Sequence, residues 1–186
     1  MAGSEKRIDR IIKNTFLLKL KPNTVSFFAL LTAFFSGYLF YSKNVLLAGF
    51  FLLLSGILDI IDGSIARLTD NVTRFGDFLD HVLDRYSDFV VLAGITFSGL
   101  VSPILGFLAM SGVFMTNYTW INARVQGLNV LYAGFVRRSV RVIITSLFCV
   151  IYLFDSNALN YLMILFAVLG NAVSIYRVIA VRRILQ

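Results

Sequence analysis

Six mainly apolar segments follow one another along this chain of 186 residues. A helix needs about 20 residues to cross the hydrocarbon core of a bilayer. Long continuous apolar runs are typical of membrane-spanning helices. With 58% hydrophobic residues the chain also exceeds the roughly 45–50% of soluble domains. We therefore expect an all-α integral membrane protein that forms a single domain over residues 1–186.

The predicted elements are one helix on the membrane surface and six transmembrane helices. Residues 4–19 place isoleucines at helical spacing opposite a basic face, which is typical of an interfacial amphipathic helix. Two spans have apolar runs that are too short for a bilayer, Val45 to Leu58 and Val142 to Phe154, so their polar ends must be helix that faces protein or a wet cavity. The six spans are expected at about 24–42, 45–69, 75–98, 102–126, 137–154 and 157–182.

Basic residues gather on one side of these spans. Fourteen lysines and arginines fall on the side of the two termini, whereas the opposite loops carry only Lys43 and Asp155. The positive-inside rule then predicts cytoplasmic termini. No small-residue cleavage pattern of a secretory signal follows the charged N-terminal segment.

The formal net charge of +7 does not indicate nucleic-acid binding. The aromatic residues lie in continuous apolar runs and are not interleaved with a basic face, so positive-inside topology explains the charge better. The single cysteine, Cys149, lies in an apolar run and is expected to be a small buried hydrophobe without an intrachain disulfide.

One acidic segment interrupts the apolar pattern. Seven of the ten acidic residues fall within thirty residues. An Asp at the centre of a spanning helix costs roughly 2.5–3.5 kcal/mol, so four that converge would cost on the order of 10 kcal/mol unless a cation neutralises them. Oxygen ligands favour magnesium, calcium or manganese. The candidate metal ligands are Asp59, Asp62, Asp80 and Asp84.

Helical periodicity places these carboxylates on the facing surfaces of two helices. The second and third spans are joined by a short loop, so we expect antiparallel neighbours whose acidic faces meet at the cytoplasmic side. Carboxylates around divalent ions suit phosphoryl transfer, and an acidic cluster also suits a divalent-cation transporter; the spacing alone does not separate the two. At about 100° per residue, one face carries Asp59, Asp62, Gly63 and Ala66, and the other carries Gly76, Asp80 and Asp84.

The spacing D-x-x-D-G-x-x-A-R, eight residues, G-x-x-x-D-x-x-x-D resembles in every fixed position the signature of the CDP-alcohol phosphatidyltransferases, integral membrane enzymes of phospholipid synthesis. A surface helix followed by six spans is also similar to that family's pattern. The resemblance implies a metal-dependent attack by a small alcohol on the lipid-linked phosphate of a CDP-lipid, with release of CMP. It further implies two Mg²⁺ or Mn²⁺ ions, CDP-diacylglycerol or CDP-archaeol as donor, and a homodimer.

The same resemblance assigns roles to individual residues. Asp59, Asp62 and Asp80 match ligands of the first metal ion. Asp84 matches a ligand of the second ion and the general base that takes the proton of the acceptor hydroxyl. The nucleotide-binding positions correspond to Gly63, Ala66, Arg67 and Gly76, with Asn23 in the turn before the first span as a further candidate.

Four arginines near the loop between the fourth and fifth spans suggest a phosphorylated acceptor, because guanidinium groups pair bidentately with phosphate. The alternative is that they are positive-inside anchors. The segments 76–88 and 134–141 resemble the family branch that uses inositol phosphate. That branch commonly has an acidic residue before the first arginine of the loop, where this chain has Arg137, so glycerol 3-phosphate stays a competing acceptor. The four arginines are Arg124, Arg137, Arg138 and Arg141.

Other polar residues near the motif are given supporting roles. His81 points about 100° away from Asp80 on the helix, which favours packing over metal ligation. Asp77 is expected at the entrance of the site, and Asp88 is expected to pair with another helix. Trp120 is typical of an interfacial anchor.

Overall fold

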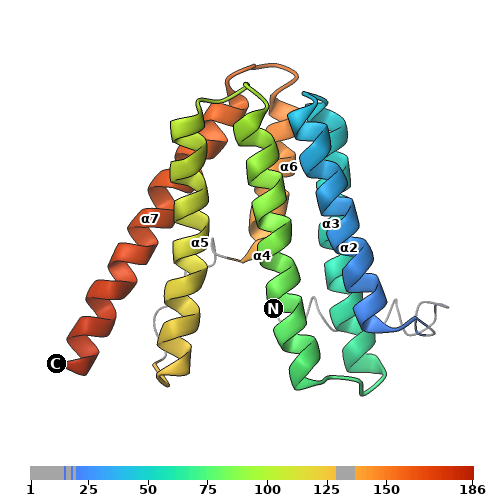
Figure 1. The fold of residues 1–186 in the computed structure, drawn as a ribbon, viewed down its shortest axis with the longest axis vertical. Helices are drawn as coiled ribbons and strands as arrows, with labels where there is room; N and C mark the ends of the chain where they lie inside the picture. Colours follow the sequence, from blue (N-terminus) through green and yellow to red (C-terminus); the bar gives the residue numbers. More distant parts are fainter. Residues whose placement is uncertain (1–14, 16–17, 19, 129–136) are drawn as a thin grey trace.

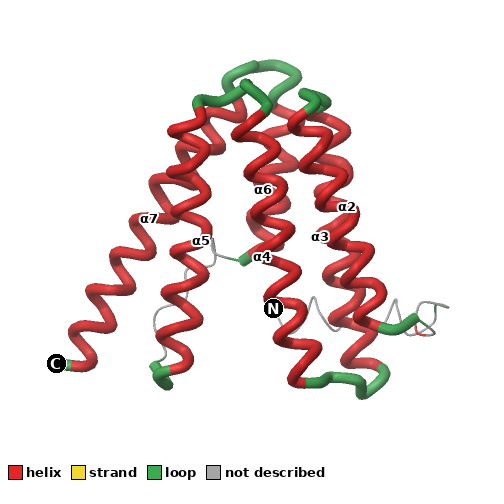
Figure 2. The backbone as a smooth tube through the Cα atoms, in the orientation of Figure 1, coloured by secondary structure: helices red, strands yellow, loops and turns green. Residues whose placement is uncertain are grey.

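The computed structural model describes residues 15, 18, 20–128 and 137–186, which form helices and turns without any strand (Figure 2). The six predicted spans agree with the observed helices to within three residues at either end. The predicted interfacial helix at 4–19 lies outside the described residues except for positions 15 and 18. The helices are α2 (Pro22–Tyr41), α3 (Val45–Leu68), α4 (Arg74–Phe97), α5 (Pro103–Val125), α6 (Arg138–Ile151) and α7 (Ala158–Leu185).

Local sequence fixes the helix ends around the acidic motif. Pro22 is the first residue of α2, where its fixed φ suits the helix and its missing N–H costs no hydrogen bond. Thr73 caps α4, since its Oγ1 accepts a hydrogen bond of 3.0 Å from the backbone N–H of Gly76. Asp77 in the first turn favours the positive end of the helix dipole. The loop between the two acidic helices is therefore anchored at the start of α4.

The helices close into a ring in which α2 packs on α3, α3 on α6, α6 on α7, α7 on α5, α5 on α4, and α4 on α2. They converge at one end and spread apart toward the other in the view of Figure 1. Although α3 and α4 are antiparallel and joined by a short loop, α2 packs closely on both, and they contact each other much less. The acidic faces of α3 and α4 therefore approach each other without close packing of the two helices, whereas the sequence predicted that the helices are direct neighbours.

Glycine pairs allow the closest helix crossings in this ring. A Cβ on Gly94 of α4 would collide with the backbone of Gly37 in α2. In the same way, a Cβ on Gly170 of α7 would lie 2.5 Å from the backbone carbon of Gly112 in α5. Small residues permit such approach between membrane helices. These two crossings hold the acidic helix α4 against α2 and the basic helix α7 against α5.

Large apolar side chains cover the outside of the ring, as expected for contact with lipid. Four helices within the described ranges are long and apolar enough to cross a membrane: α2, α3, α5 and α7. The other two helices differ from these four: α4 begins with the second half of the acidic motif, and α6 has only 14 residues. The prediction of an all-helical membrane protein is confirmed, and the count of six spans stays a prediction.

The helix ends that carry most of the basic residues lie together. The start of α2, the α3–α4 loop and the ends of α5 and α7 lie at the wide end of the molecule, and α6 begins part-way toward it (Figure 1). The opposite end carries Lys43 and Asp155. The described helices thus have the alternating topology on which the predicted orientation depends.

Candidate active site

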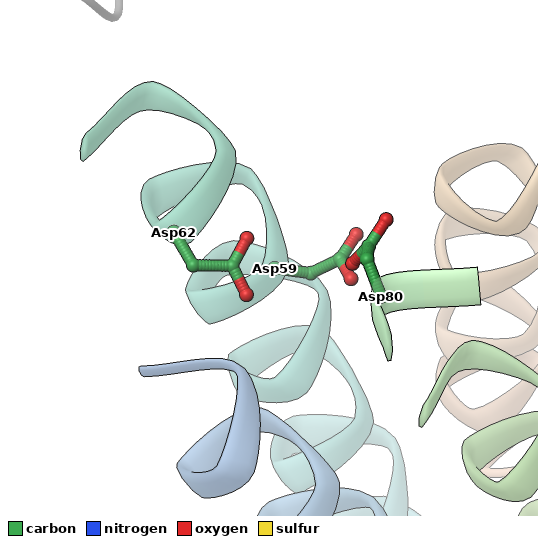
Figure 3. Close-up of side chains that lie close together, drawn as sticks. All are labelled: Asp59, Asp62 and Asp80. Atoms are coloured by element: carbon green, nitrogen blue, oxygen red, sulfur yellow. The ribbon is translucent and has the colours of Figure 1, made fainter. Parts of the chain in front are cut away.

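Three of the four predicted metal ligands converge. Asp59 and Asp62 extend from α3 and Asp80 extends from α4, and their carboxylates point toward one another (Figure 3). One oxygen from each lies within 4.8 Å of the others. An octahedral Mg²⁺ holds opposite oxygens roughly 4.2 Å apart, so small side-chain movements suffice for all three to reach one ion. Asp84, one turn beyond Asp80, is outside this cluster.

Asp62 is the predicted metal ligand that has a buried carboxylate oxygen without a hydrogen-bond partner among the described residues. Its side chain is buried, and no hydrogen-bond donor in the described part of the chain reaches its Oδ2. A buried carboxylate oxygen without a partner is costly, and the cost disappears when the oxygen binds a metal. The donor set contains only oxygen, which suits Mg²⁺ or Mn²⁺. These residues therefore fit a divalent ion.

A cavity of about 370 Å³ opens beside the three carboxylates, which all line it. The small residues Gly63 and Ala66 form part of its wall, and a Cβ on Gly63 would meet only the guanidinium of Arg67, at 3.5 Å. Ser26 and Thr73 also line it, and sequence reasoning did not identify them. All five predicted nucleotide-binding residues line this cavity: Asn23, Gly63, Ala66, Arg67 and Gly76.

Asp84 is held by an arginine from another helix. Nη1 of Arg138 donates a hydrogen bond of 2.6 Å to Oδ1 of Asp84 and another to Oδ1 of Asp59. Nη2 of Arg138 donates to the Ser55 hydroxyl at 3.0 Å. Arg138 is the first residue of α6 and its side chain is only 7% exposed. Three helices thus meet at one guanidinium.

A second cavity has a volume of about 410 Å³. Asp59 lines both cavities, and Asp84 lines only the second. Two of the predicted acceptor-binding residues, Arg137 and Arg138, line this cavity. Its walls are therefore as basic as those of the first cavity are acidic.

The second cavity also contains Arg177 and Trp120, to which the sequence did not assign a role in the site. Arg177 of α7 is 1% exposed, its Nη1 donates to the backbone oxygen of Thr116 at 2.6 Å, and its Nε meets no acceptor in the described ranges. In the sequence Arg177 resembles the other basic residues of the cytoplasmic side. Its helix position, five residues before Arg182 in a long apolar run, was the available signal that it is buried inside the protein.

The other two predicted acceptor residues lie outside this cavity. Arg124 is exposed and lies over the ring of Trp120, with 5.3 Å between the guanidinium carbon and the ring centroid. Arg141 is buried, and its Nη2 donates to Oδ2 of Asp88 at 2.5 Å. Arg85 of α4 lies 3.6 Å from the same oxygen. The expected pairing of Asp88 with another helix is thus confirmed.

The supporting residues lie close to their predicted places. His81 lies with Nδ1 3.8 Å from Oδ2 of Asp80 and lines the second cavity, outside the cluster of three carboxylates. Asp77 lines the first cavity. The buried Cys149 is a free thiol.

Comparison with known sequences identifies the family. The profile of the CDP-alcohol phosphatidyltransferase family matches residues 19–176. An archaetidylinositol phosphate synthase from Pyrococcus horikoshii is 37% identical over 137 residues, which span 74% of this chain and 73% of that protein. An archaetidylinositol phosphate synthase from Methanothermobacter thermautotrophicus is 39% identical over 106 residues, or 56% of this chain and 53% of that one.

Solved structures show the same fold. A crystal structure of Mycobacterium tuberculosis phosphatidylinositol phosphate synthase with CDP-DAG bound has a TM-score of 0.77, covers 94% of this chain and 91% of its own, and is 23% identical. The same enzyme in complex with manganese and citrate also has a TM-score of 0.77, with 94% of this chain and 87% of that chain covered. None of these comparisons supports the divalent-cation transporter. The chain belongs to the CDP-alcohol phosphatidyltransferase family and is a membrane enzyme that depends on a divalent metal and moves the phosphate-bearing part of a CDP-lipid to an alcohol.

Proposed function

We propose that this enzyme transfers the lipid phosphate of a CDP-lipid to inositol phosphate and releases CMP. The observation that carries the proposal is that Asp59 lines two cavities, one bounded by the acidic motif and one by arginines. The first would hold the nucleotide and the second the acceptor. The phosphate to be transferred would then lie beside Asp59, at the junction of the two.

The first cavity suits the CDP group. Gly63, Ala66 and Gly76 leave space at its wall for a flat nucleotide, and Arg67 supplies a guanidinium for the diphosphate. Asn23 and Ser26 at the start of α2 add hydrogen-bonding groups for the base or sugar. These roles follow from chemistry and location together.

We propose that Asp59, Asp62 and Asp80 hold one divalent ion and that Asp84 contributes to a second. When bound, the ions neutralise phosphate oxygens and stabilise the charge that develops on the leaving CMP. Asp84 is 15% exposed and lines the acceptor cavity, where it can take the proton of the attacking hydroxyl. The acceptor oxygen forms a bond to phosphorus, the bond from phosphorus to the CMP oxygen breaks, and the proton passes to Asp84.

The second cavity suits a phosphorylated polyol. Arg137 is the N-cap of α6, Arg138 is its first residue and Arg177 belongs to α7, and all three line this space. A deeply buried guanidinium such as Arg177 is costly near the membrane interior unless an anion or polar groups compensate it. A phosphate group would satisfy its Nε. Arg124 and Arg141, which the sequence also suggested, are not needed in this arrangement.

The relatives favour inositol phosphate over glycerol 3-phosphate. Both archaeal relatives and the mycobacterial enzyme of the same fold are named for inositol phosphate products. The donor is CDP-archaeol or CDP-diacylglycerol, and the assay below distinguishes the two. We further propose cytoplasmic termini and a cytoplasmic active site, from the charge asymmetry of the loops, and a homodimer, from the family resemblance alone.

The test is a panel of acceptors. Purified enzyme in vesicles is given CDP-archaeol or CDP-diacylglycerol, Mg²⁺ or Mn²⁺, and one of inositol phosphate, glycerol 3-phosphate, inositol or serine, and CMP is measured. We expect fast release with inositol phosphate and little with unphosphorylated inositol. Equal or faster release with inositol or serine would contradict the proposed acceptor cavity.

A further inference from the structure

Arg138 belongs to both halves of the site. Its guanidinium bonds to Asp59 and to Asp84, and the same side chain lines the acceptor cavity beside Arg137 and Arg177. It is thus within reach of two carboxylates that the reaction needs and of the place where an acceptor phosphate would bind. Nη1 gives both of its hydrogens to the two carboxylates, so it cannot also donate to an acceptor phosphate while these bonds persist.

Arg138 holds Asp84, the carboxylate proposed for the second ion, together with Asp59 of the first cluster. Asp59 and Asp84 each use Oδ1 to accept from Nη1 of Arg138, whereas the first cluster of Asp59, Asp62 and Asp80 lies together without Asp84. A guanidinium on these oxygens opposes a divalent ion there, through occupied lone pairs and through like charge. The phosphate of an acceptor would attract the same guanidinium away from them.

We propose that Arg138 couples acceptor binding to metal binding: it occupies Asp59 and Asp84 until an acceptor phosphate draws it into the acceptor cavity, which frees Asp84 for the second ion and for proton transfer. This inference rests on the proposed function. It makes Arg138 a specificity-determining residue, because an unphosphorylated polyol lacks the phosphate that would attract the guanidinium away from the two carboxylates. The assembled base and second metal site would form only when the phosphorylated acceptor is present.

The helix that carries Arg138 does not have to move. One turn further along α6, Arg141 bonds to Asp88 of α4 at 2.5 Å and fixes the helix against its neighbour. Arg138 is the first residue of α6, so its long side chain can swing while the backbone stays in place. The side chain would have to move only within one cavity, since Asp84 and Arg177, the proposed phosphate-binding residue, both line it.

The test measures metal binding without turnover. Purified enzyme in nanodiscs free of CDP-lipid is titrated with Mn²⁺, and free Mn²⁺ is followed by electron paramagnetic resonance, with buffer blanks for each additive. In the wild type, saturating inositol phosphate should lower the apparent Kd of the weaker Mn²⁺ site about tenfold, within the usual range of coupling between sites. Unphosphorylated inositol should leave it unchanged. By reciprocity, Mn²⁺ should tighten inositol phosphate binding by the same factor.

Variants separate Arg138 from general charge effects. Arg138→Gln should bind Mn²⁺ at the weaker site tightly without acceptor and should no longer respond to inositol phosphate. Arg138→Lys keeps the charge without the fork and should show a reduced response. Arg183→Gln removes a charge from the exposed end of α7 and should behave as the wild type does.

Two results would overturn the coupling. One is a wild-type enzyme that releases CMP with inositol phosphate although its Mn²⁺ affinity does not change on acceptor addition, which would leave the proposed function standing. The other is an Arg138→Gln variant that elutes as a folded protein and still responds fully to inositol phosphate. If Arg138→Gln does not fold, the wild-type titration with and without inositol phosphate decides.

Discussion

Replacing Arg141 with Met should destabilise the fold before it affects acceptor binding. Arg141 is 5% exposed and its Nη2 lies 2.5 Å from Oδ2 of Asp88, whose side chain is 10% exposed. Removing one partner of a buried ion pair costs about 3–5 kcal/mol, because the other charge is left uncompensated. Arg85 would remain as a counter-ion at 3.6 Å from the same oxygen. Coulomb attraction falls inversely with distance, so Arg85 supplies about 70% of the attraction of a charge at 2.5 Å.

The expected loss is therefore at the lower end of that range, about 3 kcal/mol, which corresponds to a factor of about 150 in the folding equilibrium. Reversible unfolding by SDS in mixed micelles measures it, with the fluorescence of the single tryptophan, Trp120, as the signal. The double variant Asp88→Leu with Arg141→Met should lie within about 1 kcal/mol of the wild type, since well-packed apolar groups often replace a buried pair without loss.

Kinetics on the same variants distinguish a structural pair from an acceptor-binding residue. The folded fraction of Arg141→Met should keep the wild-type KM for inositol phosphate. A stable Arg141→Met enzyme whose KM for inositol phosphate rises tenfold or more would refute the reasoning and return Arg141 to the acceptor site suggested by the sequence.

Three further predictions concern the site and its frame. Asp84→Asn should still fold, with a smaller loss in SDS unfolding than Arg141→Met because Asp59 remains to pair with Arg138, and it should lower CMP release by at least about 100-fold, since it removes the proposed base; normal turnover would exclude that role. Excess EDTA should stop CMP release and added Mn²⁺ should restore it, and activity that persists in EDTA would contradict metal dependence. Gly94→Leu should cost about 2 kcal/mol or more in SDS unfolding, because its side chain collides with the backbone of Gly37; wild-type stability would show that α2 and α4 can separate freely.

The helices and the acidic cluster were predictable because their signals are local. Apolar runs mark the helices, and the three-residue spacing of Asp59 and Asp62 together with a short loop brings Asp80 within reach. The predicted nucleotide-binding residues also lie within one loop and its flanking helices, apart from Asn23, and all line one cavity.

The basic half of the site was only partly predictable, because its contacts join distant segments. Arg138 meets Asp59 across 79 residues, and no spacing rule records that contact. Arg177 and Arg124 both look like cytoplasmic anchors in the sequence, yet one is buried in a cavity and the other is exposed. Which arginines line the proposed acceptor cavity depends on how α5, α6 and α7 pack, which hydropathy does not specify.

The shortness of α6 has a consequence for the surrounding lipid. Its 14 residues rise about 21 Å, well below the ~30 Å of a bilayer core, and apolar side chains such as Ile143 and Leu147 face outward along it. A short apolar surface is accommodated by local thinning of the bilayer. The bilayer should therefore be thinner beside α6 than elsewhere. In reconstituted vesicles we then expect turnover to vary with acyl or isoprenoid chain length and to be fastest in the thinnest bilayers.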